Sequence, residues 1–123
     1  EPRTLARAVV QDSLSTTRTA WVYADGTVRW EQRRRDCAGP SSPDLPVCDP
    51  APDEVEGFTG RLTPAGQNAL LRGIRRLDRG LGDEVEAGLA GAVSALAPRP
   101  APPGLVDLLP ELQLTDRVPV APR

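Results

Sequence analysis

The alternation of apolar and polar side chains is clearest in residues 17–32. Two runs rich in Trp, Tyr and Val flank Asp25-Gly26, a pair that favours a two-residue turn with positive φ angles. The pattern predicts a β-hairpin, and this turn would place Trp21 opposite Trp30. The side chains that alternation then brings to one face are Trp21, Tyr23, Val28 and Trp30.

Shorter patterns predict further elements at both ends of the chain. Residues Thr4 to Val10 are β-branched or apolar and favour a first strand. Near the end of the chain, residues 105–109 suit one helical turn, and alternating apolar residues from Leu112 to Val118 suit a last strand. Pro119 would end that strand or confine it to a sheet edge, since proline cannot donate to the ladder.

Two amphipathic helices are predicted in the second half of the chain. Thr63-Pro64 is a cap followed by proline at the first helical position, and the helix it begins covers about residues 64–79. Asp83 is expected to cap a second helix over residues 83–97. The apolar stripes consist of Leu70, Ile74, Leu77 and Leu81 in the first helix and Val85, Leu89, Val93 and Leu96 in the second.

Residues 33–55 are rich in Pro, Ser and Asp and predict an irregular loop. Cys37 and Cys48 lie within it. With two Cys and no His in the chain, no zinc signature is present, and a Cys37–Cys48 disulfide is the interpretation we prefer. It would stabilise a small core by about 3 kcal/mol and indicates an oxidising compartment.

We therefore expect an α+β fold: a small antiparallel sheet of three or four strands, built on the 17–32 hairpin, packed against the two helices. The disulfide-closed, Pro-rich loop would project from one edge. At 123 residues the chain has room for one core, so residues 1–97 are expected to form a single domain. Residues 98–123 would be a Pro-rich joint and a C-terminal segment packed on the same domain.

The amino-acid composition limits the partners and the kinds of catalysis that the chain can support. The net charge of −2, with both signs interspersed, does not favour a nucleic-acid partner, and no apolar run approaches the length of a membrane span. Without His or Lys, Ser-His, Cys-His and Schiff-base catalysis are excluded. We expect no enzyme activity, no catalytic residues, no metal and no cofactor.

For three local features of the sequence, a functional interpretation stays open beside a purely structural one. Acidic residues cluster late in the loop and before the first helix, where we prefer a solvated segment to a catalytic pair or a calcium site. The run Arg33-Arg34-Arg35 is either a patch for an acidic partner or, as we prefer, a solvated strand end. The hairpin aromatics are either core, which we prefer, or a binding platform. The clustered acids are Asp44, Asp49, Asp53, Glu54 and Glu56.

Residues Val22 to Val28 and then Arg61 to Leu71 carry a Tyr-x-Asp-Gly turn followed by a Leu-Thr-Pro-x-Gly helix start. This succession resembles a pattern in a family of uncharacterised exported or lipid-anchored actinobacterial proteins. It covers about a third of the chain. The resemblance implies an extracellular or cell-envelope location and no activity. The chain opens at Glu1 without an initiator Met, so we expect either that a signal segment has been removed or that the sequence is a piece cut from a longer chain.

Two functional hypotheses follow. The first is a secreted or cell-envelope protein-binding module, for example an inhibitor of a secreted enzyme, that presents the disulfide loop to its partner. The second is a structural domain of a larger envelope protein or homo-oligomer, packed through the small residues of the second helix. The loop residues expected to contact a partner in the first hypothesis are Ser42, Pro43, Asp44, Leu45 and Pro46.

Overall fold

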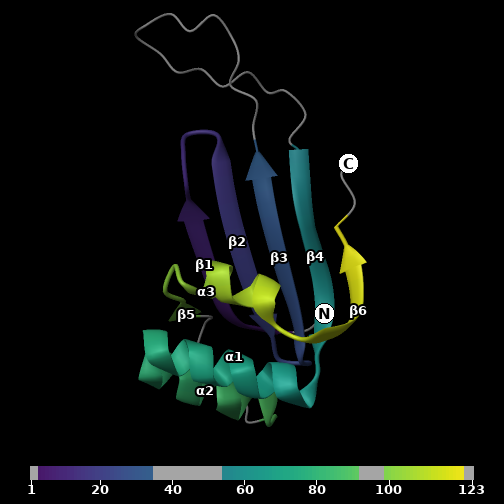
Figure 1. Cartoon of the computed structure of the whole chain (residues 1–123). Helices are drawn as coiled ribbons and strands as arrows, with labels where there is room; N and C mark the ends of the chain where they lie inside the picture. The colour runs from purple at the N-terminus through teal and green to yellow at the C-terminus, as the bar shows by residue number, and fades with distance from the viewer. Residues whose placement is uncertain (1–2, 35–53, 92–98, 121–123) are drawn as a thin grey trace, which may run out of the picture.

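One six-stranded sheet forms the body of the fold, and the helices gather on one face and at one end of it (Figure 1). The computed structural model describes residues 3–34, 54–91 and 99–120. The strand order is β5-β1-β2-β3-β4-β6, in which the two-residue β5 runs parallel to β1 and the other neighbours are antiparallel. The strands are β1 (Thr4–Gln11), β2 (Thr16–Tyr23), β3 (Thr27–Arg34), β4 (Glu54–Leu62), β5 (Arg99–Pro100) and β6 (Leu114–Pro119).

The α+β class and the antiparallel sheet are confirmed, although the sheet has more strands than the three or four expected. Strands β3 and β4 also extend into the segment 33–55 that we predicted to be irregular. Their pairing continues to Arg33↔Val55 and Arg34↔Glu54. The opposite charges of Arg34 and Glu54 favour this extension, because directly opposed residues of opposite charge stabilise a strand pair.

The β2–β3 hairpin is present, but the predicted register is wrong by one residue. Val22 pairs with Val28, and Trp21 pairs with Arg29 rather than with Trp30. The loop has three residues, and its last residue, Gly26, has φ +85° and donates its N–H to Tyr23 O at 3.1 Å. This is a type I turn closed by a residue in the left-handed region, the usual form of a three-residue hairpin loop.

This register separates the two tryptophans. Because successive side chains on a strand point to opposite faces, Trp30 and Val28 share the face that α3 covers, while Trp21 and Tyr23 lie on the opposite face. The four hairpin side chains predicted to form one patch are therefore divided between two surfaces, as a shift of one residue requires.

Helix α1 (Pro64–Leu77) begins as predicted, with the Thr63 side chain accepting the N–H of Gly66 at 2.9 Å. Helix α2 (Arg79–Leu89) begins four residues earlier than expected, so Leu81, assigned to the first helix from the sequence, belongs to the second. The helix also ends eight residues before the expected position 97, and Gly91, with φ +89°, follows its end. The N-terminal cap of α2 is Asp78, whose carboxylate accepts the N–H of Leu81 at 3.1 Å. Asp78 is extended, with φ −158°, so one aspartate both separates the helices and caps the second one.

The C-terminal segment folds back over the sheet. Helix α3 (Leu105–Leu108) and the 3-10 turn η1 (Leu109–Glu111) cross in front of the strands (Figure 1). The indole Nε1 of Trp30 donates a hydrogen bond to the carbonyl oxygen of Val106 at 2.9 Å. At the other side of α3, Arg18 of β2 forms ion pairs with Asp12 at 2.6 Å and Asp107 at 2.8 Å.

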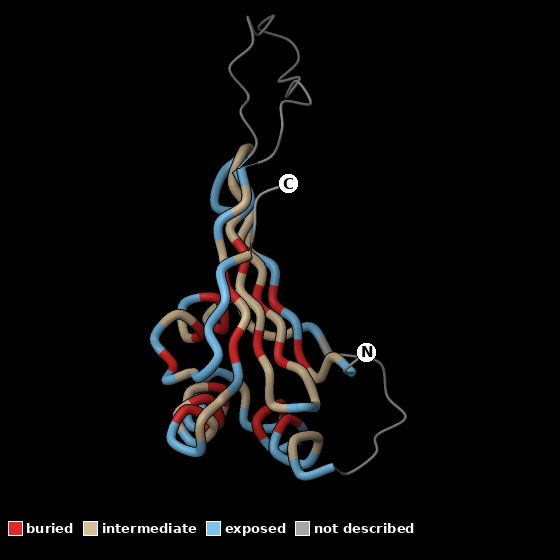
Figure 2. The backbone as a smooth tube through the Cα atoms, turned by 90° about the vertical axis from the view of Figure 1, so that its right-hand side faces the viewer, coloured by how far each residue is buried: buried red, intermediate tan, exposed pale blue. Residues whose placement is uncertain are grey.

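A single cluster of buried residues joins the sheet to the helices. In Figure 2 buried segments concentrate in the half of the sheet nearest the helices. The strands contribute small side chains such as Ala6, Ala8 and Ala20, which let the helices approach closely. The largest fully buried side chains are Leu70, Ile74, Leu81, Leu105, Leu109, Val22, Val28, Val85 and Val106.

Several predicted features lie outside the described residues. These are the Cys37–Cys48 disulfide, the loop residues Ser42, Pro43, Asp44, Leu45 and Pro46, and the side chains of Val93 and Leu96. They remain predictions from the sequence.

Gly26→Ala is expected to lower the free energy of unfolding by about 1–2 kcal/mol, because an L side chain in the left-handed region crowds its own backbone. Beyond the two neighbouring residues in the chain, no atom lies within 4 Å of the added Cβ, so we attribute the loss to strain of the local backbone. Gly26→Asn is the matched control and should lose less, since Asn tolerates this region. Equal unfolding midpoints of wild type and Gly26→Ala in urea would contradict the three-residue turn.

Candidate functional site

No described helix covers the middle of the sheet face opposite α3, which we call the open face. The exposed Val9 and Val118, with 49% and 56% of their surface accessible, lie at its two sides. The register and the alternation of side chains assign these residues of β1 to β4 to it: Arg7, Val9, Gln11, Thr17, Thr19, Trp21, Tyr23, Thr27, Arg29, Glu31, Arg33, Val55, Gly57, Thr59 and Arg61.

Arg29 is held at the centre of the open face by two neighbours. Its Nε donates to Glu31 Oε1 at 2.8 Å, and its Nη2 donates to the same oxygen. The guanidinium carbon lies 5.6 Å from the centroid of the Trp21 ring, within the range of a cation–π contact. Trp21, Arg29 and Glu31 therefore form one ordered unit on adjacent strands.

Glu31 is the buried charged residue of this unit, with 7% of its surface exposed. It lies between Thr19 on β2 and Gly57 on β4. A Cβ on Gly57 would lie 2.1 Å from the carbonyl oxygen of Trp30, so the close approach of β3 and β4 requires glycine there. A buried carboxylate is costly unless it is paired, which makes Arg29 the necessary companion of Glu31.

The open face is positively charged although the whole chain carries a net charge of −2. Among the strand residues assigned to it, the cations are Arg7, Arg29, Arg33 and Arg61, and the one acid is Glu31. The strands thus present an arginine-rich surface with Trp21 and Tyr23 on the inner strand β2. Such a surface can bind an anionic partner.

The charges and burial at this face shift the pKa values of two groups near the turn, Tyr23 and Asp25. Burial raises the pKa of Tyr23, the positive charge of Arg29 lowers it, and the charges of Glu31 and Asp25 raise it. For Asp25, burial acts to raise the pKa, but hydrogen bonds from the side chain and backbone N–H of Thr27 outweigh it, and the pKa lies below its usual value. The ionised Asp25 therefore supports the hairpin turn.

The structure separates the residues that the sequence had grouped as candidates. Arg33 and Arg34 lie on opposite faces of β3, so the arginine run does not form one patch. Glu54 and Glu56 are exposed on β4 rather than in a loop. Within the described ranges, no three acidic or cysteine side chains gather as a metal-ligand set.

Sequence reasoning missed the unit of Trp21, Arg29 and Glu31, because the assumed two-residue turn put Trp21 beside Trp30. The small-residue surface of α2 is also partly used inside the chain, since a Cβ on Gly88 would lie 2.4 Å from Cδ2 of Leu5. That contact removes Gly88 from the surface available to a second subunit.

Comparison with protein-family models, curated proteins and solved structures gives no match. In the described part of the chain, no helix has the length and apolar character needed to cross a membrane.

Tyr23 is the single tyrosine of the chain, so tyrosinate absorbance reports it alone. Its ionisation midpoint is expected above 10.0. Because the folded pKa is raised, this group stabilises the fold below pH 10 and the contribution is lost as the pH rises further. Arg29→Ala should raise the midpoint and Glu31→Gln should lower it, whereas the distant Arg76→Ala should not change it. If the ionisation midpoint of Tyr23 is the same in Arg29→Ala as in wild type, the placement of Arg29 near Tyr23 on the open face is contradicted.

Proposed function

We propose that this chain is a non-enzymatic protein-binding module of an exported or cell-envelope protein, and that its open face docks on an acidic surface of a partner protein. The observation that carries the proposal is the ordered unit of Trp21, Arg29 and Glu31 at the centre of a sheet face that no described helix covers.

The residue types on the open face are those that dominate binding energy at protein interfaces. Trp, Tyr and Arg are the residues most enriched at interface hot spots, and Trp21, Tyr23 and Arg29 are neighbours here. Arg29 is already fixed by Glu31 and Trp21. Less side-chain freedom remains to be lost on binding, which favours affinity.

Charge selects the kind of partner. Arg7 and Arg61 are exposed on this face, at the β1 and β4 sides of the central unit. Arginine surfaces attract acidic partners and accelerate their association. We favour a protein over a polyanion such as nucleic acid, because Glu31 offsets part of the positive charge and exposed Val9 and Val118 provide apolar contact at the margins.

The predicted loop fits the same proposal. The chain leaves the sheet at Arg34 and returns at Glu54, next to Arg33 and Val55 of the open face. The cysteines at 37 and 48 favour export, and the segment 42–46 would add a second contact if the module inhibits a secreted enzyme. The alternative proposal, an assembly domain, requires the chain to self-associate, and light scattering distinguishes the two.

The test is capture of proteins from culture supernatant and cell-envelope extract on immobilised wild type, Trp21→Ala, Arg7→Glu and Arg76→Glu. Arg76 is exposed on α1 and supplies a matched control of equal charge change. We expect a protein that wild type and Arg76→Glu retain and that Trp21→Ala binds about 30-fold more weakly, as for a hot-spot residue of about 2 kcal/mol. Arg7→Glu should weaken binding more at low salt than at high salt.

Equal retention by all four proteins, or retention of no protein by wild type, would contradict docking through the open face. A stable dimer that Trp21→Ala dissociates would instead support the assembly role.

A further inference from the structure

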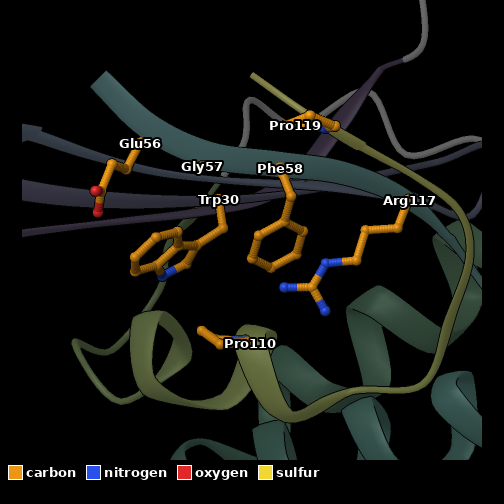
Figure 3. A pocket seen from close by; sticks show the side chains of 7 residues that line it. All are labelled: Trp30, Glu56, Gly57, Phe58, Pro110, Arg117 and Pro119. Carbon is orange, nitrogen blue, oxygen red and sulfur yellow. The ribbon is translucent and has the colours of Figure 1, made fainter. Parts of the chain in front are cut away.

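A hollow of about 400 Å³ opens on the helix face of the sheet, on the other side from the open face (Figure 3). Its size lies within the range of about 300–1,000 Å³ typical of ligand sites. It is bounded by β3, β4, β6 and η1. The lining residues are Trp30, Glu56, Gly57, Phe58, Pro110, Arg117 and Pro119.

Two stacked aromatic rings form one wall of the hollow. The centroids of Trp30 and Phe58 are 5.8 Å apart and their planes differ by 19°. The indole N–H of Trp30 is already used by the carbonyl of Val106. The ring is thereby fixed in place and offers a ligand its apolar surface rather than a hydrogen-bond donor.

Arg117 extends this stack. Its guanidinium carbon lies 4.0 Å from the Phe58 centroid, and no hydrogen bond or ion pair to Arg117 is present within the described residues. A guanidinium that stacks by its face keeps its N–H groups available at the edge, where they match a carboxylate in a bidentate geometry.

The backbone of β6 contains a bulge beside Arg117, whose side chain lines the hollow. The pairing shifts from Arg61↔Thr115 to Thr59↔Val118, which leaves one extra residue on β6. Asp116 within this bulge has φ +53°, an uncommon conformation for a residue other than glycine. Bulges of this kind redirect side chains and recur beside functional sites.

The remaining walls limit the class of ligand. Pro110 and Pro119 have no backbone N–H and the Trp30 N–H is occupied, so these walls offer no donor to the hydroxyls of a sugar, and the polar side chains of Arg117 and Glu56 lie at the two ends of the hollow. Aromatic and proline rings instead match the rings of an extended, proline-containing peptide, the ligand of other aromatic-lined grooves.

We propose that the hollow binds an extended peptide segment in which a proline packs on Trp30 and an adjacent carboxylate pairs with Arg117. The carboxylate belongs either to an aspartate side chain or to the C-terminus of the peptide. Glu56, exposed at the end of the hollow opposite Arg117 (Figure 3), sets the direction by repelling the carboxylate from that end. The site is independent of the open face.

The test is an NMR titration of the full chain with acetyl-Pro-Pro-Asp-Pro-Pro-amide, with its Asn analogue, and with acetyl-Pro-Pro-Pro as the free acid and as the amide. Binding should shift the indole N–H signal of Trp30 in a saturable way and leave that of Trp21 unchanged. The Asp peptide or the free acid should bind about 10-fold more tightly than its uncharged partner, as expected for a charged hydrogen-bonded pair.

Arg117→Gln should remove this difference between charged and uncharged peptides, whereas Arg76→Gln should keep it. Because Arg117 is exposed at a sheet edge, the variant is expected to fold, and its spectrum verifies this. Glu56→Gln is a second test: it removes the repulsion between Glu56 and the carboxylate and should strengthen binding of the charged peptides. The proposal is overturned if no peptide shifts the Trp30 signal, or if Arg117→Gln binds charged and uncharged peptides with the same preference as wild type.

Discussion

The three-residue turn between β2 and β3 is the constraint on which the rest of the structure depends. Since side chains alternate along a strand, the length of this turn decides which face each hairpin residue occupies. Closing the turn with Gly26 at φ +85° sends Trp30 toward the helices and Trp21 to the opposite face. A loop one residue shorter would have placed both tryptophans on one face of the sheet and left neither face with its present set of side chains.

Each tryptophan organises a different part of the molecule. Trp30 binds α3 to the sheet through the carbonyl of Val106 and forms a wall of the hollow. Trp21 lies beneath Arg29, which in turn neutralises the buried Glu31. The same hairpin therefore supports two recognition surfaces of different character, one broad and arginine-rich and one small and lined by rings.

The sequence predicted the elements better than their pairing. Helix α1 was predictable because Thr63-Pro64 is a strong local signal, and the strand at residues 4–10 because its pattern is local too. The start of α2 was misplaced because Asp78 and Asp83 are both plausible caps, and only packing distinguishes them. The candidate surfaces could not be predicted, since Arg29, Glu31, Phe58 and Arg117 meet through strand register and a bulge in β6 that no local pattern encodes.

The placement of the two tryptophans is tested most directly by nuclear Overhauser contacts measured on the wild-type chain. The account predicts contacts between the ring protons of Trp21 and the side chain of Arg29, and between the indole N–H of Trp30 and the backbone of α3 near Val106. Contacts between the rings of Trp21 and Trp30 would contradict it, because they require the shorter turn and a single shared face.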